Sequence, residues 1–149
     1  FESISPYTDE EAAEALSKLA EFPLLSQVSQ QFFPDQDPAF LKNLLKSINL
    51  YKSKRDLLLS LLEEHMPEGV HWTHPEGGLF LFLTMPEGFD AVKFYDKALD
   101  AGVAYVAGEF FHPDRSGKNT MRLNFSFMSP ERIVEGIRIL SKLLKDEIL

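Results

Sequence analysis

The sequence predicts an α+β fold, in which one small, mainly antiparallel sheet carries helices on a single face. Two observations support this prediction. From residue 39 onward, apolar residues at helical spacing alternate with strand-like segments in the order α-β-β-α-β-β-α. The chain has 149 residues, of which 44% are hydrophobic, and this is enough for one well-packed core. The opposite face of so small a sheet then needs a cover or a function.

The N-terminal part predicts helices that precede the main domain. Residues 8–21 predict a first helix, and residues 24–33 favour a short second one. The stretch FPDQDP at 33–38 breaks the helical pattern. We therefore separate an N-terminal helical segment over 1–36, to which the sequence assigns no role, from a domain over 37–149.

A long helix opens this domain. Asp37 caps it, and Pro38 stands at its first position, where a missing N–H costs nothing. The helix is expected to end at the MPEG stretch of residues 66–69. Its apolar stripe comprises Phe40, Leu41, Leu44, Leu45, Ile48, Tyr51, Leu58, Leu59 and Leu62.

Two predicted strands, 70–73 and 79–84, follow the long helix, and a turn that contains Gly77 and Gly78 joins them. The near-continuous apolar run of the second strand is typical of a central strand. The adjacent glycines indicate either a hairpin connection with positive φ or a close backbone approach.

The next segments predict a helix over 91–102 that ends at a glycine, and then a strand over 103–108. A polar loop over 109–119 follows, entered through two phenylalanines. The last helix begins at Pro130, with Ser129 as its cap.

The stretch NTMRLNFSF, residues 119–127, has the period-two signature of a strand with one buried face. Its apolar set is Met121, Leu123, Phe125 and Phe127, and its polar set is Arg122, Asn124 and Ser126. The apolar set is expected to face the helices and the polar set the opposite side. This pattern leaves Arg122 open to two interpretations, a solvated surface charge or a paired guanidinium that binds a carboxylate or phosphate through its planar fork.

The composition excludes several classes of partner. A net charge of −8 and a sequence pI of about 5.0 argue against nucleic acid or an anionic membrane. The absence of cysteine excludes disulfides and thiolate metal sites and agrees with a cytoplasmic location. No apolar run approaches the roughly 20 residues that a membrane helix needs. Because the chain begins Phe-Glu-Ser without a methionine, we expect it to be a piece of a longer protein.

The sequence contains no motif that identifies a catalytic or metal-binding site by itself. His71 and His74 form H-x-x-H with Glu76 nearby, but strand residues three apart point to opposite faces, so we predict no metal site. No pair of carboxylates has a spacing that specifies acid–base catalysis, and no nucleophile or phosphate-loop motif occurs. These patterns alone therefore identify no catalytic residue in this chain.

Three ordered stretches closely resemble the C-terminal small domain of fold-type I pyridoxal-phosphate-dependent aminotransferases. They are MPEGVHWTHPEGGLFLFLTMPEG (66–88), KALDAGVAYVAGEFFHPD (97–114) and NTMRLNFSFMSPERIVEGIRIL (119–140). The resemblance is to the class I/II branch, which includes 2-aminoadipate and kynurenine aminotransferases and the aminotransferase-like domains of MocR-type regulators. It covers roughly residues 37–149.

The resemblance implies roles for three residues of this chain. In the family, the arginine at the position of Arg122 forms a bidentate salt bridge with the substrate's α-carboxylate. The segment of Gly77 and Gly78 would lie near the active-site entrance and bind substrate there. The chain departs from the family where Ala107-Gly108 replaces the usual Pro-Gly, beside the loop that would border the cleft.

The resemblance also implies what the intact protein contains. It would be a transaminase that uses pyridoxal 5′-phosphate to move an amino group between an amino acid and a 2-oxo acid. It would form a homodimer and carry a large cofactor-binding domain that this chain lacks. None of the ten lysines stands in the family's Schiff-base motif, so we expect this chain alone to bind no cofactor and to be inactive.

Two alternatives remain open from the sequence. MocR-type transcription regulators carry the same domain as a ligand sensor, joined to a DNA-binding winged helix. A non-enzymatic α+β interaction module is the other alternative, and it predicts that the Arg122 face is polar and solvated.

Overall fold

The computed structural model describes residues 10, 14, 17, 18, 21 and 38–148 of the chain. The helices predicted over 8–21 and 24–33 therefore lie outside the described residues, apart from isolated positions of the first. The chain divides into two compact units, Phe1–Leu50 and Tyr51–Leu149, and the second unit contains the sheet. No helix in these described stretches is long and apolar enough to cross a membrane.

The described domain has the predicted order of elements, and its α+β class is confirmed. The helices are α3 (Pro38–His65), α4 (Ala91–Asp100) and α5 (Pro130–Ile148). The strands are β1 (His71–Trp72), β2 (Phe80–Thr84), β3 (Val106–Ala107) and β4 (Thr120–Asn124), and a short 3-10 helix, η1 (Gly108–Phe111), follows β3.

The sheet is antiparallel throughout, in the order β1-β2-β4-β3. β2 and β4 are therefore the central strands, as the apolar run of β2 predicts. Their register places Phe82 opposite Arg122 and Leu83 opposite Met121, and Val106 of β3 pairs with Arg122 on its other side. Arg122 thus has a strand neighbour on each side.

The edge strands are shorter than predicted. The strand expected over 70–73 has two residues, and the one expected over 103–108 is reduced to Val106–Ala107. Val103 and Tyr105 still face the core, but the backbone of Val103 bonds back to Ala98 of α4 instead of joining the sheet. The chain then turns into η1, so part of the predicted loop is a 3-10 helix.

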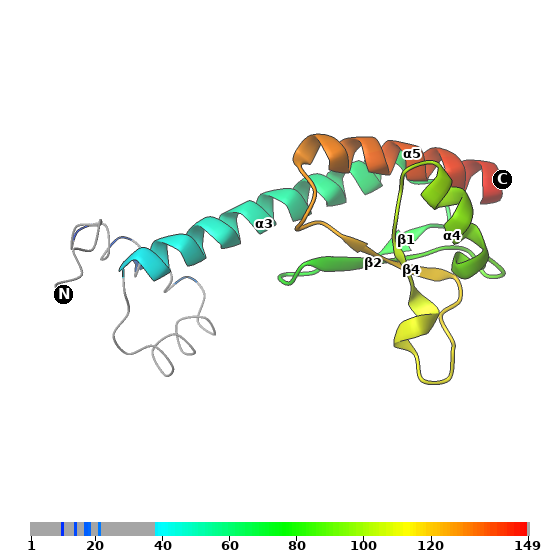
Figure 1. Cartoon of the computed structure of the whole chain (residues 1–149), viewed down its shortest axis with the longest axis horizontal. Helices are drawn as coiled ribbons and strands as arrows, with labels where there is room; N and C mark the ends of the chain where they lie inside the picture. Colours follow the sequence, from blue (N-terminus) through cyan, green and yellow to red (C-terminus); the bar gives the residue numbers. More distant parts are fainter. Residues whose placement is uncertain (1–9, 11–13, 15–16, 19–20, 22–37, 149) are drawn as a thin grey trace. The chain divides into compact units, whose positions relative to one another are not determined.

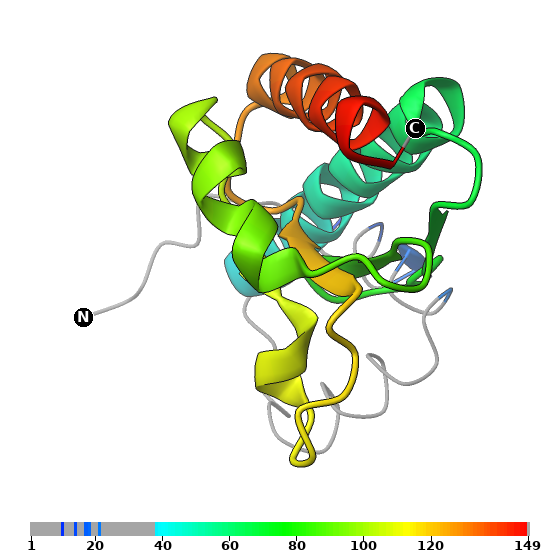
Figure 2. The same cartoon turned by 90° about the vertical axis from the view of Figure 1, so that its right-hand side faces the viewer.

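The helices cover one face of the sheet, and the loop that begins with η1 lies on the other (Figures 1 and 2). One continuous apolar core fills the space between the helices and the sheet. Its fully buried large side chains are Leu62, Leu81, Leu83, Met85, Met121, Phe125, Leu140 and Leu144. The sheet therefore has a dry face that holds the domain together and a second, more open face.

The alternation predicted for residues 119–127 holds as far as Phe125 and then fails. Met121, Leu123 and Phe125 lie in the core, whereas Phe127 is 84% exposed. The reason is local, because the Asn124 side-chain oxygen accepts bonds from the backbone N–H groups of Ser126 (2.8 Å) and Phe127 (3.0 Å). This turn takes the chain out of the strand, so the period-two pattern no longer applies.

The final helix agrees with its prediction. The Ser129 hydroxyl accepts a bond from the backbone N–H of Arg132 at 3.4 Å, as expected of a cap. The buried stripe of α5 consists of Ile133, Ile137, Leu140, Ser141 and Leu144. This stripe covers the core side of β4 and fixes which face of that strand remains open.

Candidate functional site

Arg122 lies in the middle of β4, on the face of the sheet that the helices do not cover. Its side chain is half-buried. The guanidinium carbon lies 4.0 Å from the centroid of the Phe80 ring and 4.5 Å from that of Phe111. At these distances each ring attracts the cation through its quadrupole. The guanidinium is therefore held against aromatic surface.

The two rings come from different elements. Phe80 opens β2, and Phe111 ends η1, which crosses the open face. Phe111 also meets the ring of Phe82 edge-on, with centroids 5.5 Å apart and an interplanar angle of 80°. Phe80 and Phe111 remain 38% and 43% exposed, so the aromatic surface around Arg122 is partly open.

No carboxylate among the described residues forms an ion pair with Arg122. All five arginines of the sequence lie in the described part of the chain, and three of them are paired. These pairs are Arg55–Asp56 at 2.6 Å, Arg132–Glu135 at 2.8 Å and Arg115–Glu109 at 3.7 Å. Arg138 is exposed, which leaves Arg122 as the half-buried arginine whose N–H donors are not committed to a described carboxylate.

Gly108 is the residue that lets η1 lie against β4. A Cβ atom at this buried glycine would stand 1.7 Å from the hydroxyl oxygen of Thr120 and 3.1 Å from its carbonyl oxygen. Thr120 is two residues before Arg122 on β4, so the close contact fixes the start of η1 beside the site. Phe111, at the other end of η1, is thereby carried toward Arg122.

Local bonds order the loop that follows η1. The backbone N–H of Ser116 donates to the Asp114 carboxylate at 3.0 Å, and this bond lowers the pKa of Asp114. Arg115 has a φ of 56°, a left-handed conformation that side chains other than glycine rarely adopt. Its N–H donates to the His112 carbonyl at 3.1 Å, which closes the turn.

The other two predicted site residues lie in the turn between β1 and β2. Gly78 has a φ of 80°, which confirms the positive φ predicted for the hairpin, whereas Gly77 does not need one. No described atom lies within 4 Å of a Cβ built at either residue, so the close backbone approach is not seen within the described part. Because Leu79 accepts a backbone bond from Phe125, the turn lies beyond the end of β4 and away from Arg122.

The two histidines of the H-x-x-H stretch lie on and just after the edge strand β1. His71 lies on β1 and His74 follows the end of that strand. Within the stretches that the structure describes, no group of three or more His, Asp or Glu side chains could hold a metal ion.

Comparisons with known proteins assign the chain to a family, although no protein-family model matches it. Over 107 residues, or 72% of this chain, it is 50% identical to aromatic-amino-acid aminotransferase 1 of Thermococcus litoralis, and it covers 26% of that protein. It is 34% identical over 106 residues to a 2-aminoadipate transaminase of Thermus thermophilus, covering 71% of this chain and 27% of that protein.

A solved structure supports the same assignment. A kynurenine aminotransferase of Pyrococcus horikoshii matches with a TM-score of 0.71 and 39% identity, over 90% of this chain and 34% of the other. This chain belongs to the fold-type I pyridoxal-phosphate-dependent aminotransferases. This chain spans about a quarter of the length of the curated relatives that it matches.

Another of the relatives is a transcription regulator. A helix-turn-helix transcriptional regulator of Bacillus subtilis is 30% identical over 95 residues, which cover 64% of this aminotransferase chain and 19% of the regulator. The same domain therefore also resembles part of a transcription regulator.

The lysines of the aminotransferase chain do not fit a cofactor site. All ten lie among the described residues, and nine of them are exposed. The tenth, Lys54, is 8% exposed, and its ammonium donates to the Ser126 carbonyl at 2.8 Å. It comes from α3 on the helix-covered side, so this amine is engaged in holding the chain after β4.

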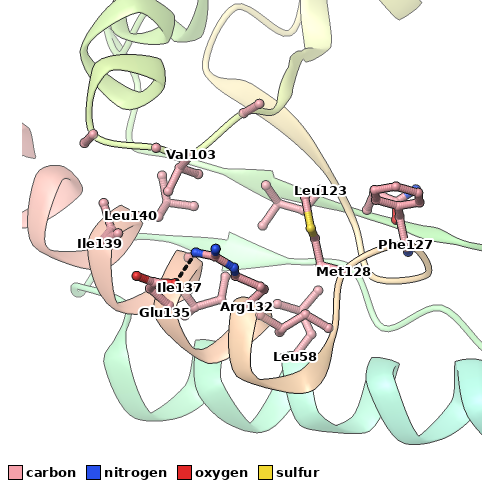
Figure 3. A pocket seen from close by; sticks show the side chains of 16 residues that line it. Leu58, Val103, Leu123, Phe127, Met128, Arg132, Glu135, Ile137, Ile139 and Leu140 are labelled. Atoms are coloured by element: carbon pink, nitrogen blue, oxygen red, sulfur yellow. Dashed lines mark hydrogen bonds and ion pairs between the residues drawn. The ribbon is translucent and has the colours of Figure 1, made fainter.

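A groove on the helix side of the domain does not include Arg122. It has a volume of about 680 Å³, and Leu58, Val103 and Met128 contribute to its apolar lining (Figure 3). Its cation, Arg132, donates to Glu135 at 2.8 Å (Figure 3). An anion would have to displace this internal partner, so the groove is a poorer carboxylate site than the Arg122 face.

The sequence did not identify Phe80 and Phe111 as parts of the site. In the sequence, Phe80 belongs to the apolar run that predicts a central strand, and Phe111 is one of two phenylalanines at the start of a predicted loop. The available signal was that Phe80 and Phe82 share a face of β2 opposite to Leu81 and would meet Arg122 in the correct register. Nothing in the sequence specified that η1 would fold back onto this face.

Proposed function

We propose that the parent protein transfers an amino group between an amino acid and a 2-oxo acid, and that Arg122 binds the α-carboxylate of both. One observation carries most of the argument. The guanidinium is half-buried against two rings, without a described carboxylate partner. A guanidinium can donate two parallel N–H bonds to the two oxygens of one carboxylate, which fixes the position and the plane of that group.

In this proposal, Arg122 acts by orientation. Two bonds to the carboxylate define where the substrate's Cα lies, and correct placement of reacting atoms lowers the barrier of later steps. The partly buried position strengthens the pair, because fewer water molecules compete for the charge than at an exposed site. The Gly77–Gly78 turn would lie at the entrance to the cleft.

Segments of the parent protein outside this chain would hold pyridoxal phosphate, since the lysines described above do not fit that role. We therefore expect no amino transfer by the 149-residue chain when pyridoxal phosphate is added. Turnover by this chain alone, lost on substitution of one of its lysines, would contradict this part of the proposal.

The carboxylate assignment is tested in the full-length protein with Arg122→Ala and Arg122→Lys. Two quantities are measured, kcat/KM for the preferred amino acid and the inhibition constants of an unreactive carboxylic acid analogue and its primary amide. Arg122→Ala should weaken carboxylate binding by about 2–5 kcal/mol, while amide binding changes little. Arg122→Lys should recover part of the loss, because it restores the charge without the planar fork.

Arg138→Ala is the matched control, since Arg138 is an exposed arginine on α5. It should preserve the preference for the acid over the amide. If Arg122→Ala also preserved that preference, the carboxylate role of Arg122 would be wrong.

A ligand-sensing role in a transcription regulator is the second candidate, favoured by the match to the Bacillus subtilis regulator. Arg122 would bind a carboxylate in both cases, so this domain does not distinguish an aminotransferase from a regulator. Experiments on the full-length protein distinguish the two. Turnover without specific DNA binding supports the aminotransferase, whereas a ligand-dependent DNA mobility shift without turnover supports the regulator.

A further inference from the structure

We propose that Phe111 is a positioning residue for Arg122, which holds the guanidinium in the orientation that receives a carboxylate. This inference rests on the proposed function, because it assumes that Arg122 binds the substrate. It adds a residue from outside β4 and the neighbouring strands, on an element whose role the sequence did not reveal.

The contacts of Phe111 support such a role. Its ring centroid lies 4.5 Å from the guanidinium carbon of Arg122, and its ring meets Phe82 edge-on at 5.5 Å. Phe82 is the β2 residue directly opposite Arg122 in the strand register. The ring of Phe111 is therefore braced by the strand pair that carries the cation.

The guanidinium needs such support because it has no described ion pair. A long arginine side chain without an ion-pair partner samples many rotamers. The entropy that it loses when a ligand orders it lowers the affinity for that ligand. A carboxylate partner within the chain would order it but would occupy the N–H donors. Aromatic rings attract the face of the cation and leave the N–H groups at its edge available.

The backbone of η1 explains how Phe111 reaches this place. Gly108 packs against Thr120 so closely that a Cβ would stand 1.7 Å from the threonine hydroxyl oxygen. The backbone N–H of His112 donates to the Glu109 carbonyl at 3.2 Å and closes the short helix. A short, closed element fixed to β4 at its first residue can hold its last residue over Arg122.

The test uses the full-length enzyme and three variants. Phe111→Leu removes the ring and keeps an apolar side chain, and Phe111→Tyr keeps the ring. Phe110→Leu is the matched control, because Phe110 is the preceding residue of η1 but is 64% exposed and has no ring contact with Arg122. The readouts are KM and kcat for the amino acid and the ratio of inhibition constants for a carboxylic acid and its amide.

Phe111→Leu should reduce the preference for the acid over the amide about three- to tenfold, which is the range expected for a lost cation–π contact. It should raise KM more than it lowers kcat. Phe111→Tyr and Phe110→Leu should remain near the wild-type values. In an Arg122→Ala background, Phe111→Leu should cause no further loss of this preference, because both changes act on one interaction.

The role of Phe111 would be contradicted by an equal effect of Phe110→Leu, by an equal loss of acid and amide binding, or by a further loss of acid preference in the Arg122→Ala background. If Phe111→Leu does not fold, Phe111→Met takes its place, since methionine is apolar and adapts to irregular gaps. If Arg122→Ala abolishes the acid preference but Phe111→Leu leaves it unchanged, the role of Phe111 fails alone. If Arg122→Ala itself has no effect, the proposed function fails, and the role of Phe111 with it.

Discussion

The two faces of β4 are one residue apart in sequence and differ in almost every physical respect. On the helix side, Met121 is 0% exposed and lies within a continuous apolar core. On the other side, Arg122 is half-buried against partly open rings, with no carboxylate partner among the described residues. The comparison shows how one strand can separate the residues that stabilise the domain from those available to a ligand.

The largest expected difference in stability between the two faces comes from substitutions at two adjacent positions. Met121→Ala should lower the free energy of unfolding by about 2–5 kcal/mol, because it leaves a cavity in the core. Arg122→Ala should lower it by no more than about 1–2 kcal/mol, the value of its cation–π contacts. Urea denaturation of the chain, followed by circular dichroism, measures both. Equal losses at the two positions would contradict the division of β4 into a face that stabilises the domain and an open face that contributes little to its stability.

The second test concerns the contact that brings η1 onto the open face. Gly108→Ala should lower the free energy of unfolding by about 1–3 kcal/mol, because the added methyl group overlaps Thr120. Gly77→Ala is the matched control and should change it by less than about 0.5 kcal/mol, since that position is open and needs no positive φ.

The origin of the Gly108 effect can be checked by a double-mutant cycle. In a Thr120→Gly background, the side chain that the alanine would strike is absent, so Gly108→Ala should be less harmful. An undiminished loss in that background would mean that the contact with Thr120 does not set the position of η1.

The smallest expected change in stability concerns the turn at Asn124, where the alternation of buried and open side chains along β4 ends. Asn124→Ala removes the oxygen that accepts bonds from Ser126 and Phe127, and it should lower the free energy of unfolding by about 1 kcal/mol. Asn124→Asp retains an acceptor and should recover most of this loss. If alanine and aspartate had the same effect, the turn after β4 would not depend on this side chain.

The parts of the fold that the sequence predicted correctly are those that local periodicity decides. The alternation of Met121, Leu123 and Phe125 identified the buried face of β4, because burial of one face requires period two along an extended chain. Phe127 has the same parity but lies beyond the Asn124 turn. Its misassignment arose because a side-chain bond to the backbone ends the extended conformation without altering the apolar pattern.

The candidate site was predicted only in part, for a different reason. Arg122 could be identified from its strand and from the resemblance to a family. Phe111 could not, because its contact depends on the close fit of Gly108 against Thr120, which is a three-dimensional property. Such contacts between distant segments leave no regular spacing in the sequence.

The register between β2 and β4 has a consequence for errors in folding. A slip of one residue would turn the side chains of β4 over, which would place Arg122 in the apolar core and Met121 on the open face. A buried guanidinium without a partner is strongly unfavourable, so the slipped form would be unstable. Arg122 therefore also disfavours mispairing of the two strands, and molecules that complete folding carry this guanidinium on the open face of the sheet.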